Sequence, residues 1–237
     1  MIHANLIIFD CDGVLVDTEP LTNRVLAQCV TDAGWEVDTQ YSINHFKGRN
    51  LDDILFDVET HLGTKLPNLM DQYRTRMYEE IESCGVPALN GIHELLDTLD
   101  AMGDDAPHRC VGTNAPVKKA TLTLTGSNLI NRFGHRTDPD KKTLFSAYEV
   151  GKWKPDPGLF LHAAESMGHR PEDCIVVEDS ISGVAAARNA NMRVIGIASL
   201  TPADDLLKAG ATQIIESHHE LIDELTTHHA SNSRKPR

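Results

Sequence analysis

Short apolar runs recur along the chain and are bounded by glycine, proline or polar residues. They are rich in Val, Ile and Leu and lack alternation with polar residues, a pattern typical of strands that are buried on both faces of a sheet. We therefore predict strands at residues 6–9, 110–112, 174–177, 194–198 and 213–215.

Between these strands, apolar residues recur at helical spacing. Examples are Ile92, Leu95, Leu96 and Leu99, and again Leu221, Ile222 and Leu225. The alternation of strands and helices predicts an α/β fold with a Rossmann-like core built on a mainly parallel sheet. In such sheets ligands bind beyond the carboxyl ends of the strands, which is where the polar clusters of this chain lie.

One long interval, from Asp10 to Thr113, interrupts this alternation. It is far longer than a crossover between parallel strands requires, and its apolar residues also recur at helical spacing. We predict an inserted α-helical cap domain at residues 17–88, a catalytic core at 1–16 and 89–227, and a disordered tail at 228–237. Because the insertion begins just beyond Asp12, it is suited to act as a lid, and a helical subdomain that merely packs is the alternative.

Composition and charge narrow the class of protein. Of the 237 residues, 41% are apolar, which is enough for a core without disulfides. Five scattered cysteines without C-x-x-C spacing, and a start unlike a signal peptide, predict a cytoplasmic protein. No apolar run has the length of a membrane helix, and the net charge of -13 opposes binding to nucleic acid or anionic membranes. An anionic substrate must then be attracted locally, by a metal or a placed lysine.

The first motif is Asp10-Cys11-Asp12-Gly13-Val14, directly after an apolar strand. Residues two apart on a strand share one face, so Asp10 and Asp12 can converge on one ligand while Gly13 lets the chain turn away. A strand end that merely forms an acidic turn is the alternative. Cys11, between the two acids, is predicted to be a buried thiol packed behind the site.

Three further polar motifs are predicted at the ends of later strands. Thr113 and Asn114 precede a helix that begins near Pro116, where free N–H groups can bind phosphate, although this is also an ordinary helix cap. Lys154 lies in a Lys-Pro-Asp-Pro loop that can aim its ammonium, although a solvated lysine fits as well. Glu178 and Asp179 precede a helix that opens at Ser180, where capping is the simpler explanation.

The ordered set of four motifs indicates a metal-assisted phosphate site. Carboxylate oxygens from opposite sides of a cleft suit Mg²⁺, which takes few protein ligands and keeps several waters. A threonine hydroxyl and a lysine ammonium suit the phosphate oxygens that such a metal bridges.

These motifs resemble those of the haloacid dehalogenase-like superfamily, in the phosphatase branch with a helical cap. The matching residues are Asp-x-Asp-Gly-Val at 10–14, Thr113, Lys-Pro-x-Pro at 154–157 and Glu-Asp-Ser-x-x-Gly at 178–183. Within the branch, Phe46-Lys47-Gly48 and Trp153-Lys154-Pro155-Asp156-Pro157 are similar to bacterial 6-phosphogluconate phosphatases. β-Phosphoglucomutases are a less close match.

The resemblance implies a role for each motif residue. Asp10 is the nucleophile that forms an aspartyl-phosphate, and Asp12 protonates the leaving oxygen and later deprotonates water. Mg²⁺ is held by Asp10, the Asp12 backbone carbonyl and Asp179, with Glu178 in support. Thr113, Asn114 and Lys154 are expected to bind the transferring phosphate. The implied partner is a small phosphorylated metabolite, and the protein is expected to be a monomer or homodimer.

In the predicted cap, Lys47, Gly48 and Arg49 are candidates for binding a sugar-acid carboxylate, although a solvated basic turn is as good an explanation. A sugar-phosphate mutase is the alternative enzyme. The positions of the mutases' cap histidine and phosphate-binding arginine carry Thr22 and Leu51 here, which disfavours it. A phosphometabolite-binding protein without turnover is the alternative of another class.

The histidine pairs at 218–219 and 228–229 are predicted to lie on solvated faces, because adjacent helical residues point apart.

Overall fold

The computed structural model describes residues 4–47, 49–134 and 140–223 and divides the chain into two compact units. The core unit comprises Met1–Val16 and Ala88–Arg237, and the helical unit comprises Asp17–Pro87. In the described part of the chain, we find no helix with the length and apolar character needed to cross a membrane. The predicted tail at 228–237 lies outside the described residues.

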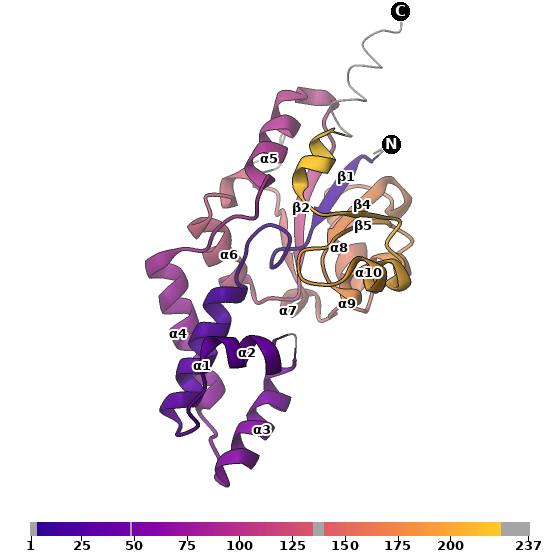
Figure 1. The fold of residues 1–237 in the computed structure, drawn as a ribbon. Coiled ribbons are helices and arrows are strands. Elements are labelled where there is room, and N and C mark those ends of the chain that lie inside the picture. Colours follow the sequence, from indigo (N-terminus) through magenta and orange to yellow (C-terminus); the bar gives the residue numbers. More distant parts are fainter. Residues whose placement is uncertain (1–3, 48, 135–139, 224–237) are drawn as a thin grey trace, which may run out of the picture. The chain divides into compact units, whose positions relative to one another are not determined.

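The core unit is built on a parallel sheet (Figure 1), whose six strands lie in the order β3-β2-β1-β4-β5-β6. Its strands are β1 (Leu6–Phe9), β2 (His108–Thr113), β3 (Leu144–Ser146), β4 (Cys174–Glu178), β5 (Arg193–Ile197) and β6 (Gln213–Ile215). This is a Rossmann-like order with a helical insertion after β1, so the predicted fold class is confirmed. The short edge strand β3 was absent from the predicted strands, because its few residues show no distinct apolar run.

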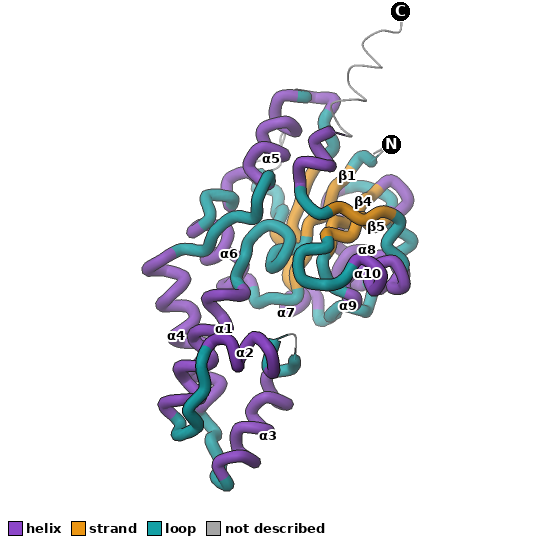
Figure 2. The backbone as a smooth tube through the Cα atoms, viewed as in Figure 1, coloured by secondary structure: helices purple, strands orange, loops and turns teal. Residues whose placement is uncertain are grey.

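Helices cover both faces of this sheet (Figure 2). One face packs against α5 (Ile92–Ala101) and α6 (Val117–Gly126), and the other against α8 (Gly158–Met167), α9 (Ile181–Asn189) and α10 (Ala203–Ala209). Shorter helical elements of the core unit include α7 (Ala147–Val150) and the 3₁₀ turns Gly103–Asp105, Ile130–Phe133 and Pro171–Asp173. Two buried clusters, one on each face, therefore hold the strands whose carboxyl ends carry the polar motifs.

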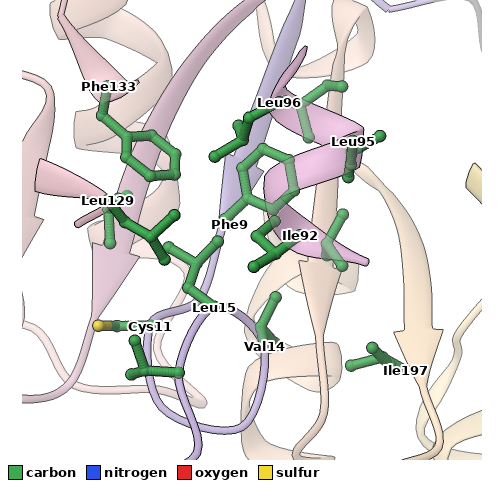
Figure 3. Close-up of a cluster of buried hydrophobic side chains, with 14 of the residues drawn as sticks. Phe9, Cys11, Val14, Leu15, Ile92, Leu95, Leu96, Leu129, Phe133 and Ile197 are labelled. Carbon is green, nitrogen blue, oxygen red and sulfur yellow. The ribbon is translucent and has the colours of Figure 1, made fainter. Parts of the chain in front are cut away.

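Side chains of β1 alternate between the two clusters, as expected for a strand inside a sheet. Phe9 faces α5 beside Leu96 and Ile92, and its ring lies 5.9 Å from that of Phe133 in an edge-to-face arrangement (Figure 3). Ile8 faces the opposite cluster. Full burial of a side chain such as Phe9 stabilises the fold by about 1.5–3 kcal/mol, so the strand that precedes Asp10 is firmly anchored.

The helical unit contains α1 (Glu19–Asp32), α2 (Thr39–His45), α3 (Leu51–Leu62) and α4 (Leu69–Cys84). The side chains of Asp38 and Asn50 accept hydrogen bonds from Tyr41 N and Asp52 N, and so cap α2 and α3. Within the unit, α1 packs against both α2 and α4. A buried hydrogen bond of 2.9 Å from Ser42 Oγ to Asn23 Oδ1 joins α1 to α2.

A buried histidine attaches the last described helical segment, residues 218–223, to the loop after β1. His218 Nε2 donates a 2.7 Å hydrogen bond to the carbonyl of Val14, and its Nδ1 has no hydrogen-bond partner among the described residues. The prediction of a solvated face is therefore wrong for His218, because the first turn of this segment packs inward, and it holds for the exposed His219. Residues 228–229 lie outside the described part of the chain.

Acid is expected to destabilise the core unit through His218. Burial lowers the pKa of His218, so the folded protein binds this proton more weakly than the unfolded chain and loses stability as the pH falls below about 6.5. His218→Gln should reduce the loss of Tm between pH 7.5 and pH 5.5, whereas the exposed His219→Gln should leave it as in the wild type. Equal pH dependence in all three proteins would contradict this assignment.

Candidate active site

The carboxyl ends of three neighbouring strands bring most of the motif residues to one edge of the sheet. β1 lies between β2 and β4, so Asp10 follows β1 beside Thr113 at the end of β2 and Glu178 at the end of β4. Lys154 was predicted to lie at the end of a strand. In the structure the short helix α7 separates its loop from β3. Its side chain nevertheless reaches the same edge.

Three buried carboxylates, those of Asp10, Glu178 and Asp179, offer ligand atoms that all lie within 4.8 Å of one another. Lys154 Nζ lies 2.5 Å from both Asp10 Oδ1 and Glu178 Oε1, and only 3% of its side chain is exposed. Its ammonium also lies 4.9 Å from the centre of the Phe160 ring. Three carboxylates against one ammonium leave an excess of negative charge, which fits a divalent cation bound by hard oxygen ligands.

The protonation equilibria of the acids reflect this crowding. Burial raises the pKa of Asp10 to about 7, the ammonium of Lys154 acts in the opposite direction, and the carboxylate of Glu178 adds to the rise. Burial likewise raises the pKa of Asp179 to about 8, with Glu178 and Asp10 contributing. For Lys154, burial alone would lower the pKa, but the two adjacent carboxylates outweigh it and the pKa is raised. Lys154 therefore stays positively charged, whereas Asp10 and Asp179 hold their protons more tightly than ordinary carboxyl groups do.

Glu178 is held in place by the start of α9. Its Oε2 accepts hydrogen bonds of 2.9 Å from both the backbone N and the Oγ of Ser180. Ser180 Oγ in turn accepts from Gly183 N at 3.0 Å and so caps the helix. Ser180 thus holds one carboxylate oxygen of Glu178, and Lys154 holds the other.

Two glycines are required for the close approach of the acids. Gly13 has φ +81°, and a Cβ there would overlap the carboxylate of Asp179. A Cβ on Gly183 would overlap the carboxylate of Glu178. The glycines of the first and last motifs therefore make room for the metal-binding group.

Gly183→Ala is expected to lower kcat/KM by about 100-fold or more, because Glu178 must leave its position beside Lys154. Crowding in the buried site should also lower stability by about 1–3 kcal/mol. The matched control is Gly134→Ala, where a Cβ meets nothing within 4 Å and activity should be unchanged. Steady-state kinetics and urea unfolding measure both effects, and an active Gly183→Ala variant would contradict the packing argument.

The loop after β2 positions the lysine loop. Asn114 Oδ1 accepts a 3.0 Å hydrogen bond from the backbone N of Lys154, and Ser146 Oγ donates a 2.6 Å hydrogen bond to the carbonyl of Ala115. The buried Thr113 accepts from Ala115 N at 3.0 Å. Asn114 therefore holds the backbone of Lys154, and Ser146 fixes the loop after β2 at Ala115. Neither role could be predicted from the sequence, since both depend on the proximity of β2 and β3.

Asp12 lies outside the group of three carboxylates and forms a separate ion pair. Its Oδ2 lies 2.8 Å from Nζ of Lys119 on α6, and 30% of its side chain is exposed. Lys119 is absent from the predicted site residues. Its position in the first turn of a helix, where acidic residues are favoured, is the signal that could have identified it. Cys11 is fully buried, as predicted, and its Sγ lies 3.7 Å from Thr123 Oγ1.

The predicted residues of the cap belong to the helical unit. Arg49 is exposed and forms an ion pair of 2.8 Å with Asp57, and its Nη1 donates to the carbonyl of His45. Lys47 is half-buried, and Gly48 lies outside the described residues. Their role in binding a substrate stays a prediction.

Comparison with known proteins agrees with the observed fold. Residues 7–197 match the family of haloacid dehalogenase-like hydrolases. The chain therefore belongs to this family. Its buried acidic group of Asp10, Glu178 and Asp179 suggests a divalent metal site.

Individual relatives narrow the class further. A 6-phosphogluconate phosphatase from Escherichia coli (strain K12) is 32% identical over 196 residues, which cover 82% of this chain and 82% of the relative. A phosphorylated carbohydrates phosphatase from Thermotoga maritima is 27% identical and covers 89% of this chain and 93% of its own length. The resemblance to the phosphatase branch and the expected class of phosphoric monoester hydrolase are thus confirmed at the level of homologues.

Solved structures show the same architecture. A haloacid dehalogenase-like protein from Agrobacterium tumefaciens str. C58 superposes with a TM-score of 0.76 at 30% identity, and the match covers 95% of this chain and 99% of that chain. The shared fold thus extends over both units of the chain.

Proposed function

We propose that this protein is a Mg²⁺-dependent phosphatase that hydrolyses a small phosphorylated metabolite, a sugar or sugar-acid phosphate, through an aspartyl-phosphate on Asp10. The observation that carries the proposal is the Asp10 carboxylate beside Lys154 and the two further carboxylates of Glu178 and Asp179. The kinship to two phosphatases of phosphorylated carbohydrates and sugar acids supports the substrate class.

In the first step an oxygen of Asp10 attacks phosphorus while the bond from phosphorus to the leaving oxygen breaks. Asp12 donates its proton to that leaving oxygen, so that an alcohol departs. Lys154 and Thr113 hold the oxygens of the transferring phosphoryl group, and Asn114 keeps the backbone of Lys154 in place.

In the second step Asp12 takes a proton from water as the water oxygen bonds to phosphorus. The bond between Asp10 and phosphorus breaks and inorganic phosphate is released. The two aspartates have different surroundings, since Asp10 lies buried beside Lys154 and Asp12 is partly exposed beside Lys119.

The donor set fits Mg²⁺. Asp10, Asp179 and the backbone carbonyl of Asp12 would hold the ion, with Glu178 in support. When bound, it would offset the repulsion between the carboxylates and the phosphate dianion. In the helical unit, Lys47, Gly48 and Arg49 remain the predicted residues for the leaving group of the substrate.

A panel of phosphorylated metabolites, assayed for phosphate release with and without Mg²⁺, tests the proposal. We expect release from 6-phosphogluconate or hexose phosphates to exceed release from nucleotides and to stop in the presence of EDTA. Interconversion of sugar-phosphate isomers with little free phosphate would indicate a mutase instead. Binding of phosphate esters without any turnover would indicate a binding protein.

A further inference from the structure

A lysine outside the four motifs contacts the second aspartate of the catalytic loop. Lys119 Nζ lies 2.8 Å from Asp12 Oδ2, and 16% of the lysine side chain is exposed. Lys154 pairs with Asp10 and Glu178 in the buried part of the site. Each of the two aspartates in the first motif therefore contacts a different ammonium.

The position of Lys119 is unfavourable for the helix that carries it. Lys119 lies in the first turn of α6, which contains Val117, Lys118 and Lys119 and no acidic residue. The helix dipole disfavours cations at this end. Helix stability thus gives no reason for a lysine at 119, whereas the carboxylate of Asp12 gives one.

The same helix is packed rigidly behind the catalytic loop. Ala120 and Leu124 are buried in the cluster that includes Phe9. The Oγ1 of Thr123, one turn beyond Lys119, contacts Sγ of Cys11, which lies between the two aspartates. Because the helix and the loop are packed together at Cys11, the backbone positions that carry Lys119 and Asp12 are held side by side.

We propose that Lys119 is a positioning residue that holds the carboxyl group of Asp12 in the orientation from which the proton is transferred. The inference rests on the proposed function, since it assigns Asp12 the role of acid and base. Lys119 acts through Asp12: as the bond from phosphorus to the leaving oxygen breaks, the proton of Asp12 passes to that oxygen, and Lys119 itself neither gains nor loses a proton.

The test uses two aryl phosphates that differ in their need for a proton. p-Nitrophenyl phosphate has a stable leaving anion, and phenyl phosphate has a more basic one that depends more on general acid catalysis. Lys119→Met should lower kcat/KM for phenyl phosphate by roughly 10-fold to 100-fold, and for p-nitrophenyl phosphate by a clearly smaller factor. Lys119→Gln provides the same comparison with a polar replacement if the methionine variant folds poorly.

Two controls separate positioning from other roles. Lys118→Met removes the same charge from the exposed neighbour of Lys119 and should leave both substrates unaffected. In the background of Asp12→Asn, Lys119→Met should change kcat/KM by about twofold or less, because the group it positions is already lost. A full additional loss in that background would assign Lys119 a direct contact with substrate and overturn the proposal.

Equal losses for the two substrates would also overturn it and would indicate a structural role, as would a loss of activity that follows a loss of Tm. Failure of the proposed function has a different signature, since the wild-type protein would then release phosphate from neither ester. The proteins with single substitutions and the double variant therefore decide the question without knowledge of the physiological substrate.

Discussion

Asp10→Asn is expected to lower phosphate release by a factor on the order of 10⁴ or more, because an amide cannot form the aspartyl-phosphate. The substitution keeps the shape of the side chain in a site where Lys154 Nζ lies 2.5 Å from Oδ1. Phosphate release under saturating substrate and Mg²⁺ measures the effect. Mass spectrometry of acid-quenched wild-type protein should detect one added phosphoryl group, which the variant lacks.

The same substitution is expected to stabilise the metal-free protein at alkaline pH. Because burial raises the pKa of Asp10 to about 7, the folded protein binds this proton more tightly than the unfolded chain. That contribution to stability is complete below about pH 4 and is lost as the pH rises through 7. At pH 8 in EDTA the Asp10→Asn variant should therefore unfold a few °C above the wild type. Adding Mg²⁺ should raise the Tm of the wild type more than that of the variant.

A matched control for this variant is Asp204→Asn, on the exposed first turn of α10, which should retain normal turnover. Turnover within a few-fold of wild type in Asp10→Asn would contradict the nucleophile assignment. A lower Tm of the variant at pH 8 would contradict the interpretation of the crowded carboxylates.

Lys154→Met is expected to lower kcat by about 100-fold to 1000-fold. The substitution removes the ammonium that contacts both Asp10 and Glu178, and so leaves the transferring phosphoryl group without its buried cation. Stability of the metal-free protein should fall by about 3–5 kcal/mol, because the buried carboxylates lose their partner. Steady-state kinetics and urea unfolding in EDTA measure the two effects.

Metal titration distinguishes the role of Lys154 in phosphate binding from a role in charge balance. Without its ammonium the acidic group is more negative, so the rise in Tm on adding Mg²⁺ should be at least as large as in the wild type. The control Lys152→Met removes an exposed lysine two residues earlier, which pairs with Asp156 at 3.4 Å, and should have little effect. If high Mg²⁺ restored the activity of Lys154→Met, the lysine would serve only to balance charge.

The parallel strands and the identity of the motif residues could be predicted from sequence because both depend on local patterns. An uninterrupted apolar run such as 6–9 is compatible with few environments other than the inside of a sheet, and β1 is buried at every position. Polar residues that directly follow such a run must lie at the edge of the sheet. Asp10, Thr113, Glu178 and Asp179 were predicted as site residues in this way.

The contacts of a residue could not be predicted from its neighbours in sequence where distant parts of the chain form its environment. His218 has an ordinary polar neighbourhood in sequence, yet it is buried against Val14, and Lys119 reaches Asp12 from a helix that follows another strand. The strand β3 is short, and its pairing with β2 brings Ser146 to the loop of Ala115. None of these contacts leaves a periodic signal in the residues around it.

By itself, the sequence determined the α/β class, the helical insertion and the acids that lie at the ends of the strands, because periodicity and strand ends are properties of neighbouring residues. Only the tertiary structure decided that β1 lies between β2 and β4, that Lys154 bridges Asp10 and Glu178, and that Lys119 faces Asp12. Those facts depend on strand order and on helix packing, which arise from contacts between residues far apart in the chain.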